Sequence, residues 1–241
     1  MSHNLQNRIA LITGASRGIG QAVAVRFAKE GAQVIAGARD VKGLEETDDL
    51  IRADGSSATL VEIDLTDTSK IEVWAQQVAA RFGKLDILVG NAASLGEISP
   101  LSDQSPYAWD KVMATNLTAN FHLIRCFDGL LKQSDAPRAI FVTSGVTEIP
   151  AAYWGAYAVS KSALESMVNI YAAENAKAYP DFKINLIDPG AVRTRLRAQV
   201  FPGEDPEQLP EPEAITEIFV TLAGLELKET GRKFSPATSA A

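Results

Sequence analysis

Short apolar runs alternate along this chain with longer stretches of helical periodicity. Most of the runs are almost continuously apolar, as in strands that are buried on both faces of a sheet. They stand at residues 8–13, 33–38, 58–63, 85–89, 139–143 and 183–187. Helical patterns separate them at residues 18–29, 41–53, 69–82, 107–131 and 157–178. The alternation predicts an α/β fold with a doubly wound parallel sheet that carries helices on both faces.

The length and composition are those of a single globular domain. The chain has 241 residues, 46% of them hydrophobic and 22% charged, and neither a repeat nor a linker divides it. Residues 189–212 break the alternation, because they are rich in Pro, Gly and acidic residues around a short helical pattern near 193–200. Ligands of doubly wound sheets bind at the carboxyl ends of the strands. We therefore expect one Rossmann-type domain over residues 1–241, with a substrate loop at about 189–212.

A glycine-rich turn follows the first apolar run and opens a helical pattern. Glycine lets the backbone turn tightly and approach a pyrophosphate, which then rests on the N-terminus of the helix. The glycines could serve a structural turn alone, but their place between a strand and a helix favours a dinucleotide site. Its predicted contacts are Gly14, Ser16, Arg17, Gly18, Ile19 and Gly20.

The second apolar run ends where an acidic residue would hold the ribose 2′-OH of NAD. Ala38 stands there instead, with Arg39 beside it and Arg17 in the glycine turn. Two arginines near the adenosine ribose suit a 2′-phosphate. Either arginine alone would be interpreted as a solvated surface charge. The pair favours NADP(H) as the cofactor, with NAD(H) as the alternative.

Ser144, Tyr157 and Lys161 form a second group. Tyr157 and Lys161 are four residues apart in a helical stretch and therefore share one face, with Cβ atoms about 5–6 Å apart. Such a pair alone could be a tyrosine packed under a lysine stem. Ser144 strengthens the functional interpretation, because it follows an apolar run and so falls at the carboxyl end of the sheet. The group predicts acid–base chemistry next to the dinucleotide.

Taken together, these motifs resemble the short-chain dehydrogenase/reductase family, in its compact single-domain branch. The likeness runs from about residue 8 to residue 224. Two shorter segments, 154–157 and 201–206, resemble an uncharacterised bacterial oxidoreductase subgroup without a known substrate. The family motifs, in the family's order and spacing, are residues 13–20, Asp64-Leu65, Asn91-Ala92-Ala93, Asn116, Ser144, Tyr157, Lys161 and residues 189–194.

The resemblance implies catalytic roles for four residues. Tyr157 would donate a proton to a substrate carbonyl oxygen as hydride arrives from the nicotinamide, and Ser144 would orient that oxygen. Lys161 would favour the phenolate, lowering the pKa of Tyr157 from its usual value of about 10, and would hold the nicotinamide ribose. Asn116 would anchor a water that links Lys161 to solvent. From the residues alone, Asn116 could equally be an amide that braces a helix kink.

The resemblance also implies further cofactor contacts. Asp64 would accept a hydrogen bond from the adenine, although a carboxylate there could also be a helix N-cap. Asn91 would brace the central sheet near the cofactor, and Thr194 would bind the nicotinamide carboxamide. The full set implied outside the glycine turn is Arg39, Asp64, Leu65, Asn91, Ala92, Tyr157, Lys161, Pro189, Gly190, Val192 and Thr194.

The chain departs from the family pattern in three places. Ala93 stands where the family usually has Gly, which alters the backbone approach there. Residues 143–145 read Thr-Ser-Gly in place of the commoner paired serines but keep Ser144. The C-terminal strand is reduced to residues 231–234, which puts contacts made through that end in doubt.

Several classes of function find no support. The net charge of −7 argues against a nucleic-acid surface. The histidines, His3 and His122, and the lone Cys126 form no ligand set, so we expect no metal site and no intrachain disulfide. No apolar run reaches the 18 residues of a membrane span, and the first residues lack the apolar core of a signal peptide. We therefore expect a cytoplasmic enzyme.

The sequence predicts an NADP(H)-dependent oxidoreductase acting on a small carbonyl or alcohol. The alternatives are an NAD-dependent alcohol dehydrogenase of the same fold and an inactive dinucleotide-sensing regulator, although such regulators usually lack the tyrosine or the lysine. The helical patterns 107–131 and 157–178 carry apolar residues around more of their circumference than one sheet contact needs. The resemblance implies that these helices pair across a two-fold axis, so we expect a homodimer or homotetramer. A pocket with apolar walls is expected to favour a neutral ketone or aldehyde. Its lining is predicted as Leu95, Ile149, Tyr153, Trp154, Val192, Leu196 and Phe201.

Overall fold

The central strands form because their runs are apolar on both faces, and the structure buries them on both faces, whereas the edge strand at Ala58–Glu62 is only partly buried. The computed structural model describes residues 4–149 and 151–236. Every residue is buried in the strands at Ile9–Thr13, Ile87–Gly90 and Arg138–Val142. The strands are β1 (Ile9–Thr13), β2 (Gln33–Ala38), β3 (Ala58–Glu62), β4 (Ile87–Gly90), β5 (Arg138–Val142), β6 (Lys183–Ile187) and β7 (Lys233–Phe234). The six predicted runs match β1 to β6 to within two residues at each end.

The seven strands of the described residues run parallel in one sheet of order β3-β2-β1-β4-β5-β6-β7. The order reverses at β1, which pairs with β2 on one side and with β4 on the other. From β1 the chain proceeds outward to β2 and β3 on one side, and from β4 it proceeds outward to β5, β6 and β7 on the other. The loops on the two sides therefore diverge and leave a crevice outside the carboxyl ends of β1 and β4. The predicted doubly wound fold is confirmed, and so is the reduced terminal strand β7.

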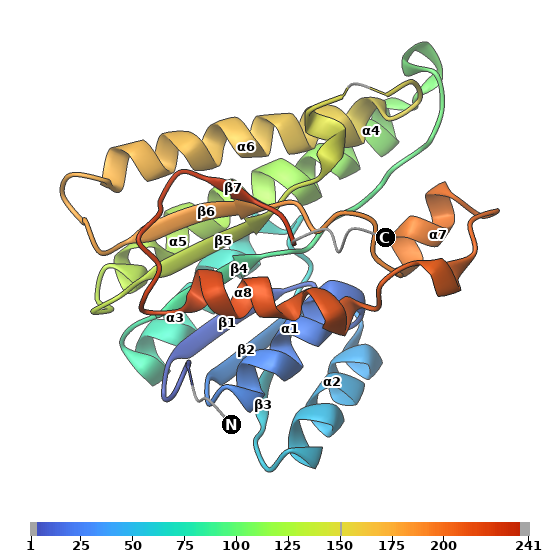
Figure 1. Ribbon diagram of the computed structural model, residues 1–241. Helices are drawn as coiled ribbons and strands as arrows, with labels where there is room; N and C mark the ends of the chain where they lie inside the picture. The colour runs from blue at the N-terminus through green and yellow to red at the C-terminus, as the bar shows by residue number, and fades with distance from the viewer. Residues whose placement is uncertain (1–3, 150, 237–241) are drawn as a thin grey trace.

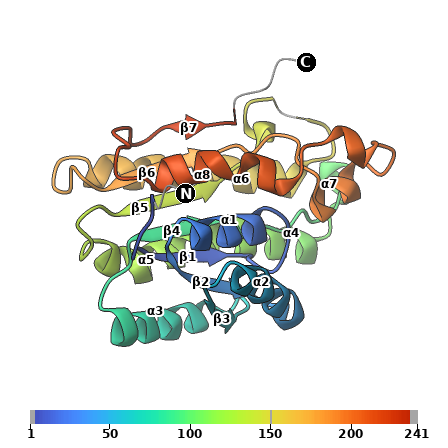
Figure 2. The same ribbon diagram turned by 60° about the horizontal axis from the view of Figure 1, so that its bottom comes forward.

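Helices cover both faces of the sheet, as Figures 1 and 2 show. One layer holds α1 (Gly18–Lys29), α2 (Val41–Ala53) and α8 (Thr216–Ala223), whose buried residues share a core with one face of the sheet. The other layer holds α3 (Thr68–Phe82), α5 (Ala119–Leu131) and α6 (Gly155–Asn175), which share the second core. The short helices are α7 (Arg195–Val200), η1 (Leu101–Asp103), η3 (Gly145–Thr147), η4 (Pro206–Gln208) and η5 (Pro212–Ile215).

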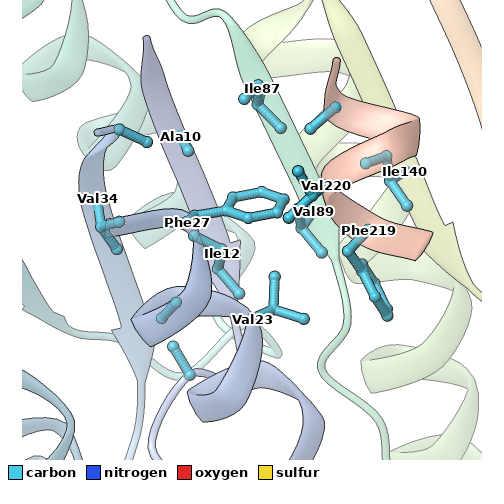
Figure 3. Packing of buried hydrophobic residues seen from close by; sticks show 14 of the residues in the cluster. Ala10, Ile12, Val23, Phe27, Val34, Ile87, Val89, Ile140, Phe219 and Val220 are labelled. Carbon is cyan, nitrogen blue, oxygen red and sulfur yellow. The ribbon is translucent and has the colours of Figure 1, made fainter. Parts of the chain in front are cut away.

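The first core is built around Phe27 of α1, which is fully buried. Figure 3 shows its ring among Ala10, Ile87 and Val89 of the sheet, with Val220 of α8 close by. Burying a phenylalanine side chain contributes about 1.5–3 kcal/mol. This packing fixes α1 against β1 and β4, and so fixes the turn that joins β1 to α1.

The prediction of one regular helix over residues 107–131 is wrong. The structure divides it into α4 (Pro106–Met113), a π-helical turn η2 (Ala114–Thr118) and α5. Ser105 caps α4 by accepting a hydrogen bond from the Ala108 amide at 3.2 Å. The π-turn places Asn116 at the junction, where single π-turns are often associated with function. None of the helices among the described residues has both the length and the hydrophobicity needed to cross a membrane.

Candidate active site

A cleft of about 860 Å³ opens at the carboxyl ends of the strands, a volume within the range of small-molecule sites. The glycine turn after β1 and the ends of β4 and β5 form one side of it, and α7 borders the other. Seventeen predicted site residues from seven separate segments of the chain meet there: Gly14, Ser16, Arg17, Gly18, Ile19, Arg39, Asp64, Leu65, Asn91, Ala92, Ser144, Tyr157, Lys161, Pro189, Gly190, Val192 and Thr194. Two predicted residues, Gly20 and Asn116, do not line the cleft.

The glycine turn has the backbone geometry that its sequence predicts. Gly14 and Gly18 have φ values of +68° and +57°, in the left-handed region that favours glycine. A Cβ atom on Gly20 would lie 2.3 Å from the Gly14 carbonyl oxygen, so Gly20 acts by letting α1 pack close to the turn. The Arg17 side chain at the N-cap makes no capping hydrogen bond. The first turn of α1 therefore presents its N-terminus to the cleft, as an anion requires.

Asn91 joins the ends of the two central strands. Its amide Nδ2 donates to the Thr13 carbonyl at 2.9 Å, and its backbone N–H donates to Thr13 Oγ1 at 3.0 Å. Its side chain also lies next to the place that a Cβ on Gly20 would need. Asn91 thus braces β1 against β4 beside the glycine turn.

Arg17 and Arg39 both reach the cleft with exposed guanidinium groups, their side chains being 58% and 60% exposed. Arg17 lies 3.8 Å from Asp40, and Arg39 lies 3.9 Å from Asp64. Exposed pairs at this distance contribute at most about 1 kcal/mol, so both cations can turn to a bound anion.

Asp40 also lines the cleft. It was not predicted as a site residue, because the acidic residue that binds a ribose was expected at the end of β2 itself. Its side chain caps α2 by accepting a hydrogen bond from the Gly43 amide at 3.2 Å. The spacing of Asp40 and Gly43 before a helical pattern is the signal that could have found it. Because its carboxylate is engaged at the helix N-terminus, it is a poor partner for a ribose hydroxyl.

Asp64 does not cap the helix that follows it, since α3 begins at Thr68 with Asp67 at its N-cap. Its carboxylate instead accepts hydrogen bonds from the amide and the hydroxyl of Thr66, at 3.0 and 2.8 Å. Burial alone would raise the pKa of Asp64, but these bonds and the nearby Arg39 charge lower it below its usual value. The residue is thus an ionised acceptor at the edge of the cleft.

Tyr157, Ser144 and Lys161 come together at the end of β5. Ser144 follows that strand, and its hydroxyl is hydrogen-bonded to Tyr157. Tyr157 and Lys161 are both buried on α6. The Lys161 Nζ atom donates to the Val142 carbonyl at 2.7 Å and lies 5.9 Å from the centre of the Tyr157 ring. The geometry places an acid, a hydroxyl and a cation within one small region.

The predicted lowering of the Tyr157 pKa by Lys161 is wrong in this structure. Burial raises the pKa of Tyr157 to about 12, because it outweighs the hydrogen bond from Ser144, and the Asp188 charge adds to the rise. Burial likewise lowers the pKa of Lys161 to about 8, against the opposing charge of Glu165. The ammonium points at the Val142 carbonyl rather than at the phenol oxygen. The resting form of Tyr157 is therefore the protonated phenol.

Asn116 is fully buried and holds a junction together. Its Oδ1 accepts from the Ser94 amide at 2.7 Å, while its Nδ2 donates to the Ser94 carbonyl and to Ser160 Oγ at 2.9 and 3.0 Å. These bonds join the π-turn to the loop after β4 and to α6. Of the two interpretations left open by the sequence, this geometry is that of a brace; the water-anchoring role stays a prediction.

An aromatic row extends from Tyr157 to α7. The ring centre of Trp154 lies 5.7 Å from that of Tyr157 and 6.2 Å from that of Phe201. The Arg197 guanidinium stacks on Phe201 at 3.8 Å and forms two 2.7 Å bonds with Glu204. The row forms an apolar wall between the Tyr157 ring and the loop that follows β6.

The predicted lining is only partly right. Leu95, Trp154, Val192 and Leu196 line the cleft. The prediction is wrong for Phe201, which does not line the cleft but packs against Trp154. The prediction is wrong for Ile149 and Tyr153, which do not line the cleft and are 76% and 56% exposed. Tyr153 has a φ of +75°, a left-handed conformation that turns the chain so that the next residue, Trp154, enters the site.

Among the described residues, no group of three or more His, Cys, Asp or Glu side chains could hold a metal ion.

Comparison with known proteins places the chain among relatives of the same architecture. The model of the short chain dehydrogenase family matches residues 8–205. The uncharacterized oxidoreductase YciK of Escherichia coli K12 is 38% identical over 95% of this chain and 92% of its own length. A short chain dehydrogenase of Escherichia coli CFT073, crystallised with NADPH, is 36% identical at a TM-score of 0.92, covering 98% and 99% of the two chains. One from Shigella flexneri, crystallised with NADP, has the same identity and TM-score and covers 97% and 99%.

Proposed function

The chain belongs to the short chain dehydrogenase family, and we propose that it is an NADP(H)-dependent oxidoreductase that interconverts a carbonyl compound and its alcohol. The observation that carries the proposal is the meeting of the glycine turn with Ser144, Tyr157 and Lys161 in one cleft. Neither group alone would be specific. Together they put a proton donor beside the place where a dinucleotide fits.

The residues of the cleft fit NADP(H). The glycine turn and the N-terminus of α1 suit the pyrophosphate, and the guanidinium groups of Arg17 and Arg39 suit the 2′-phosphate, as charge-assisted donors. Thr194, Pro189 and Gly190 line the same cleft after β6, with Thr194 next to Gly18, and would hold the nicotinamide end near Tyr157. The NADP and NADPH of the two crystallised relatives support this choice for the present chain. When bound, NADPH supplies the hydride.

The chain's own residues supply the proton. In reduction, Ser144 donates a hydrogen bond to the carbonyl oxygen and orients it, and the Tyr157 phenol transfers its proton to that oxygen as the carbonyl carbon gains the hydride. The products are an alcohol and a phenolate. Lys161, whose pKa is lowered to about 8, is a nearby proton source for restoring the phenol. In oxidation the same phenolate removes the proton from the alcohol.

The proposed substrate class follows from the apolar wall of the cleft and from the ion pairs of the nearby arginines. Trp154 and Leu196 present apolar surface, and Phe201 continues the aromatic row. Arg193 and Arg197 are held by Glu211 and Glu204, so neither is aimed at a substrate carboxylate. Arg195 also lines the cleft but is exposed, at its rim. Residues 189–212 are the proposed substrate loop. A neutral ketone or aldehyde of medium size, with an aryl or alkyl group for the aromatic wall, suits this site.

The experiment is a panel of carbonyl compounds followed by the loss of NADPH absorbance, with Tyr157→Phe as the matched variant. We expect turnover of aryl or alkyl ketones or aldehydes, and no preference for polyhydroxylated or highly charged compounds. An inactive regulator would bind NADPH and turn over nothing in the panel, and an NAD-dependent enzyme would work faster with NADH. Turnover confined to sugars would contradict the substrate class while leaving hydride transfer standing.

A further inference from the structure

Glu165 lies one helical turn beyond Lys161 on α6, outside the cleft, and joins three segments of the fold. One oxygen, Oε1, accepts hydrogen bonds from Thr143 Oγ1 at 2.6 Å, from Thr147 Oγ1 at 2.7 Å and from Lys233 Nζ at 3.2 Å. The Glu165 side chain is only 20% exposed. These three hydrogen bonds hold the Glu165 carboxylate in one position, because hydrogen bonds to a charged acceptor are stronger than those between neutral groups.

Two of the three donors stand on either side of Ser144. Thr143 is the residue before it, and Thr147 ends the short turn η3 that begins after it. Thr147 also binds Ser144 directly, since its amide and its hydroxyl lie 3.1 and 2.9 Å from the Ser144 carbonyl. A hydroxyl has one proton, and the Thr147 hydroxyl lies closer to the charged Glu165. The backbone around Ser144 is therefore attached to α6 at both ends through one carboxylate.

The third donor comes from the C-terminal strand. Lys233 on β7 contacts Glu165 and Thr147 at 3.2 Å each and Glu148 at 2.9 Å, and its side chain is 24% exposed. Strand β7 lies next to β6 at the edge of the sheet (Figure 1), so this lysine reaches across β6 to the turn after β5. Its ammonium supplies a counter-charge to the Glu165 carboxylate, 3.2 Å away. The reduced terminal strand is thus linked to the turn that follows Ser144.

From this network we infer that Glu165 is a positioning residue for Ser144, and that Lys233 of β7 holds Glu165 in place. Glu165 lies outside the cleft, and its hydrogen bonds reach Ser144 through the threonines on both sides of that residue. The charge of Glu165 also acts on Lys161, and Lys233→Met separates the two effects because it keeps that charge. The catalytic consequence rests on the proposed function, in which Ser144 orients the substrate oxygen. A displacement of about 1 Å in such a group can cost up to about 100-fold in rate.

The test uses the full chain with Glu165→Leu, Lys233→Met, Lys233→Arg and a control, Lys132→Met. Lys132 pairs with Asp128 at 2.8 Å and is 23% exposed, which matches Lys233, but it is the C-cap of α5 and contacts the Tyr179 ring rather than the turn after β5. Hydrogen exchange over residues 143–149 measures the attachment without any substrate. The Kd for NADPH and the separate kcat and KM for a panel carbonyl measure its consequence.

We expect exchange at 143–149 to quicken by at least about fivefold in Glu165→Leu and Lys233→Met, but not in Lys132→Met or Lys233→Arg. The first two variants should lose at least about tenfold in kcat with the Kd for NADPH within about twofold of wild type. Unchanged exchange would overturn the inference, and so would faster exchange with an unchanged kcat. If Glu165→Leu fails to fold, Lys233→Met decides. If wild type reduces no carbonyl, the proposed function fails, while the exchange result still decides whether Glu165 and Lys233 fix this turn.

Discussion

At the scale of single residues, burial fixes the resting protonation of Tyr157 and Lys161. The phenol pKa is raised to about 12 and the ammonium pKa is lowered to about 8, so both groups shift toward their neutral forms. A protonated phenol at neutral pH is the form that donates to a carbonyl oxygen. Carbonyl reduction can therefore use the phenol that predominates at pH 7, whereas alcohol oxidation needs the phenolate, which is scarce at that pH.

This asymmetry predicts opposite pH dependences for the two directions. The phenolate fraction rises about tenfold per pH unit below the phenol pKa, so alcohol oxidation should increase steeply from pH 6 to pH 8, and carbonyl reduction should not. The check is kcat in each direction across this range, with Tyr157→Phe as the control that should lose the oxidative slope. An oxidation rate that is flat from pH 6 to pH 8 would mean that the phenol is already ionised, against the burial argument.

Cofactor choice is also decided by single side chains. Arg39 is exposed in the cleft, and its pairing with Asp64 at 3.9 Å is weak, so Arg39→Asp should remove the partner of the 2′-phosphate and repel it. Wild type should bind NADPH at least about tenfold tighter than NADH, a difference of about 1.4 kcal/mol, and the variant should abolish or reverse it. Calorimetry with both cofactors measures this, with Arg81→Asp at the far end of α3 as the matched charge change. Equal affinities of wild type for the two cofactors would refute the role of the arginine pair.

At the scale of elements, the sequence predicted what local patterns encode. Most of the strands from β1 to β6 were predictable because a strand buried on both faces is almost continuously apolar. The π-turn at Ala114–Thr118 was not, because apolar spacing hardly changes across one widened turn. What holds that turn is a long-range contact, in which Asn116 reaches Ser94 and Ser160 from other segments. No spacing rule reveals such a contact.

The same distinction separates the site residues that were predicted from those that were missed. Gly14, Tyr157 and Lys161 stand in compact motifs, and the structure brings them to the cleft as predicted. The Glu165–Lys233 contact joins residues 68 positions apart and has no local signature. The wrong expectation for the Tyr157 pKa has a similar origin, since spacing places Lys161 near the ring but cannot show its Nζ bonding to a backbone carbonyl.

At the scale of the whole molecule, the layer that holds α5 and α6 carries apolar side chains on its outside. Phe121 of α5 is 49% exposed and Ile170 of α6 is 56% exposed. Apolar groups grouped on one face favour association, and we propose a symmetric dimer or tetramer through this layer. The cytoplasmic location stays a prediction.

Light scattering tests the assembly, because a single chain has a mass of 25.8 kDa. Wild type at micromolar concentration should show at least twice that mass, and Phe121→Glu or Ile170→Glu should reduce it. Leu225→Glu is the control, since Leu225 is 57% exposed but follows α8 on the other layer. A wild-type particle of one chain would contradict the proposal, and so would an assembly that survives both charge substitutions.

The central claim concerns a hydride and a proton delivered in one cleft, and isotope transfer tests it most directly. NADPH carrying deuterium at the transferred position of the nicotinamide is incubated with the best carbonyl of the panel, and the alcohol is analysed by mass spectrometry. The account predicts one deuterium on the former carbonyl carbon, formed at least about 100-fold more slowly by Tyr157→Phe, with NADPH binding retained. Transfer by Tyr157→Phe at the wild-type rate, or no transfer by wild type to any carbonyl, would contradict it.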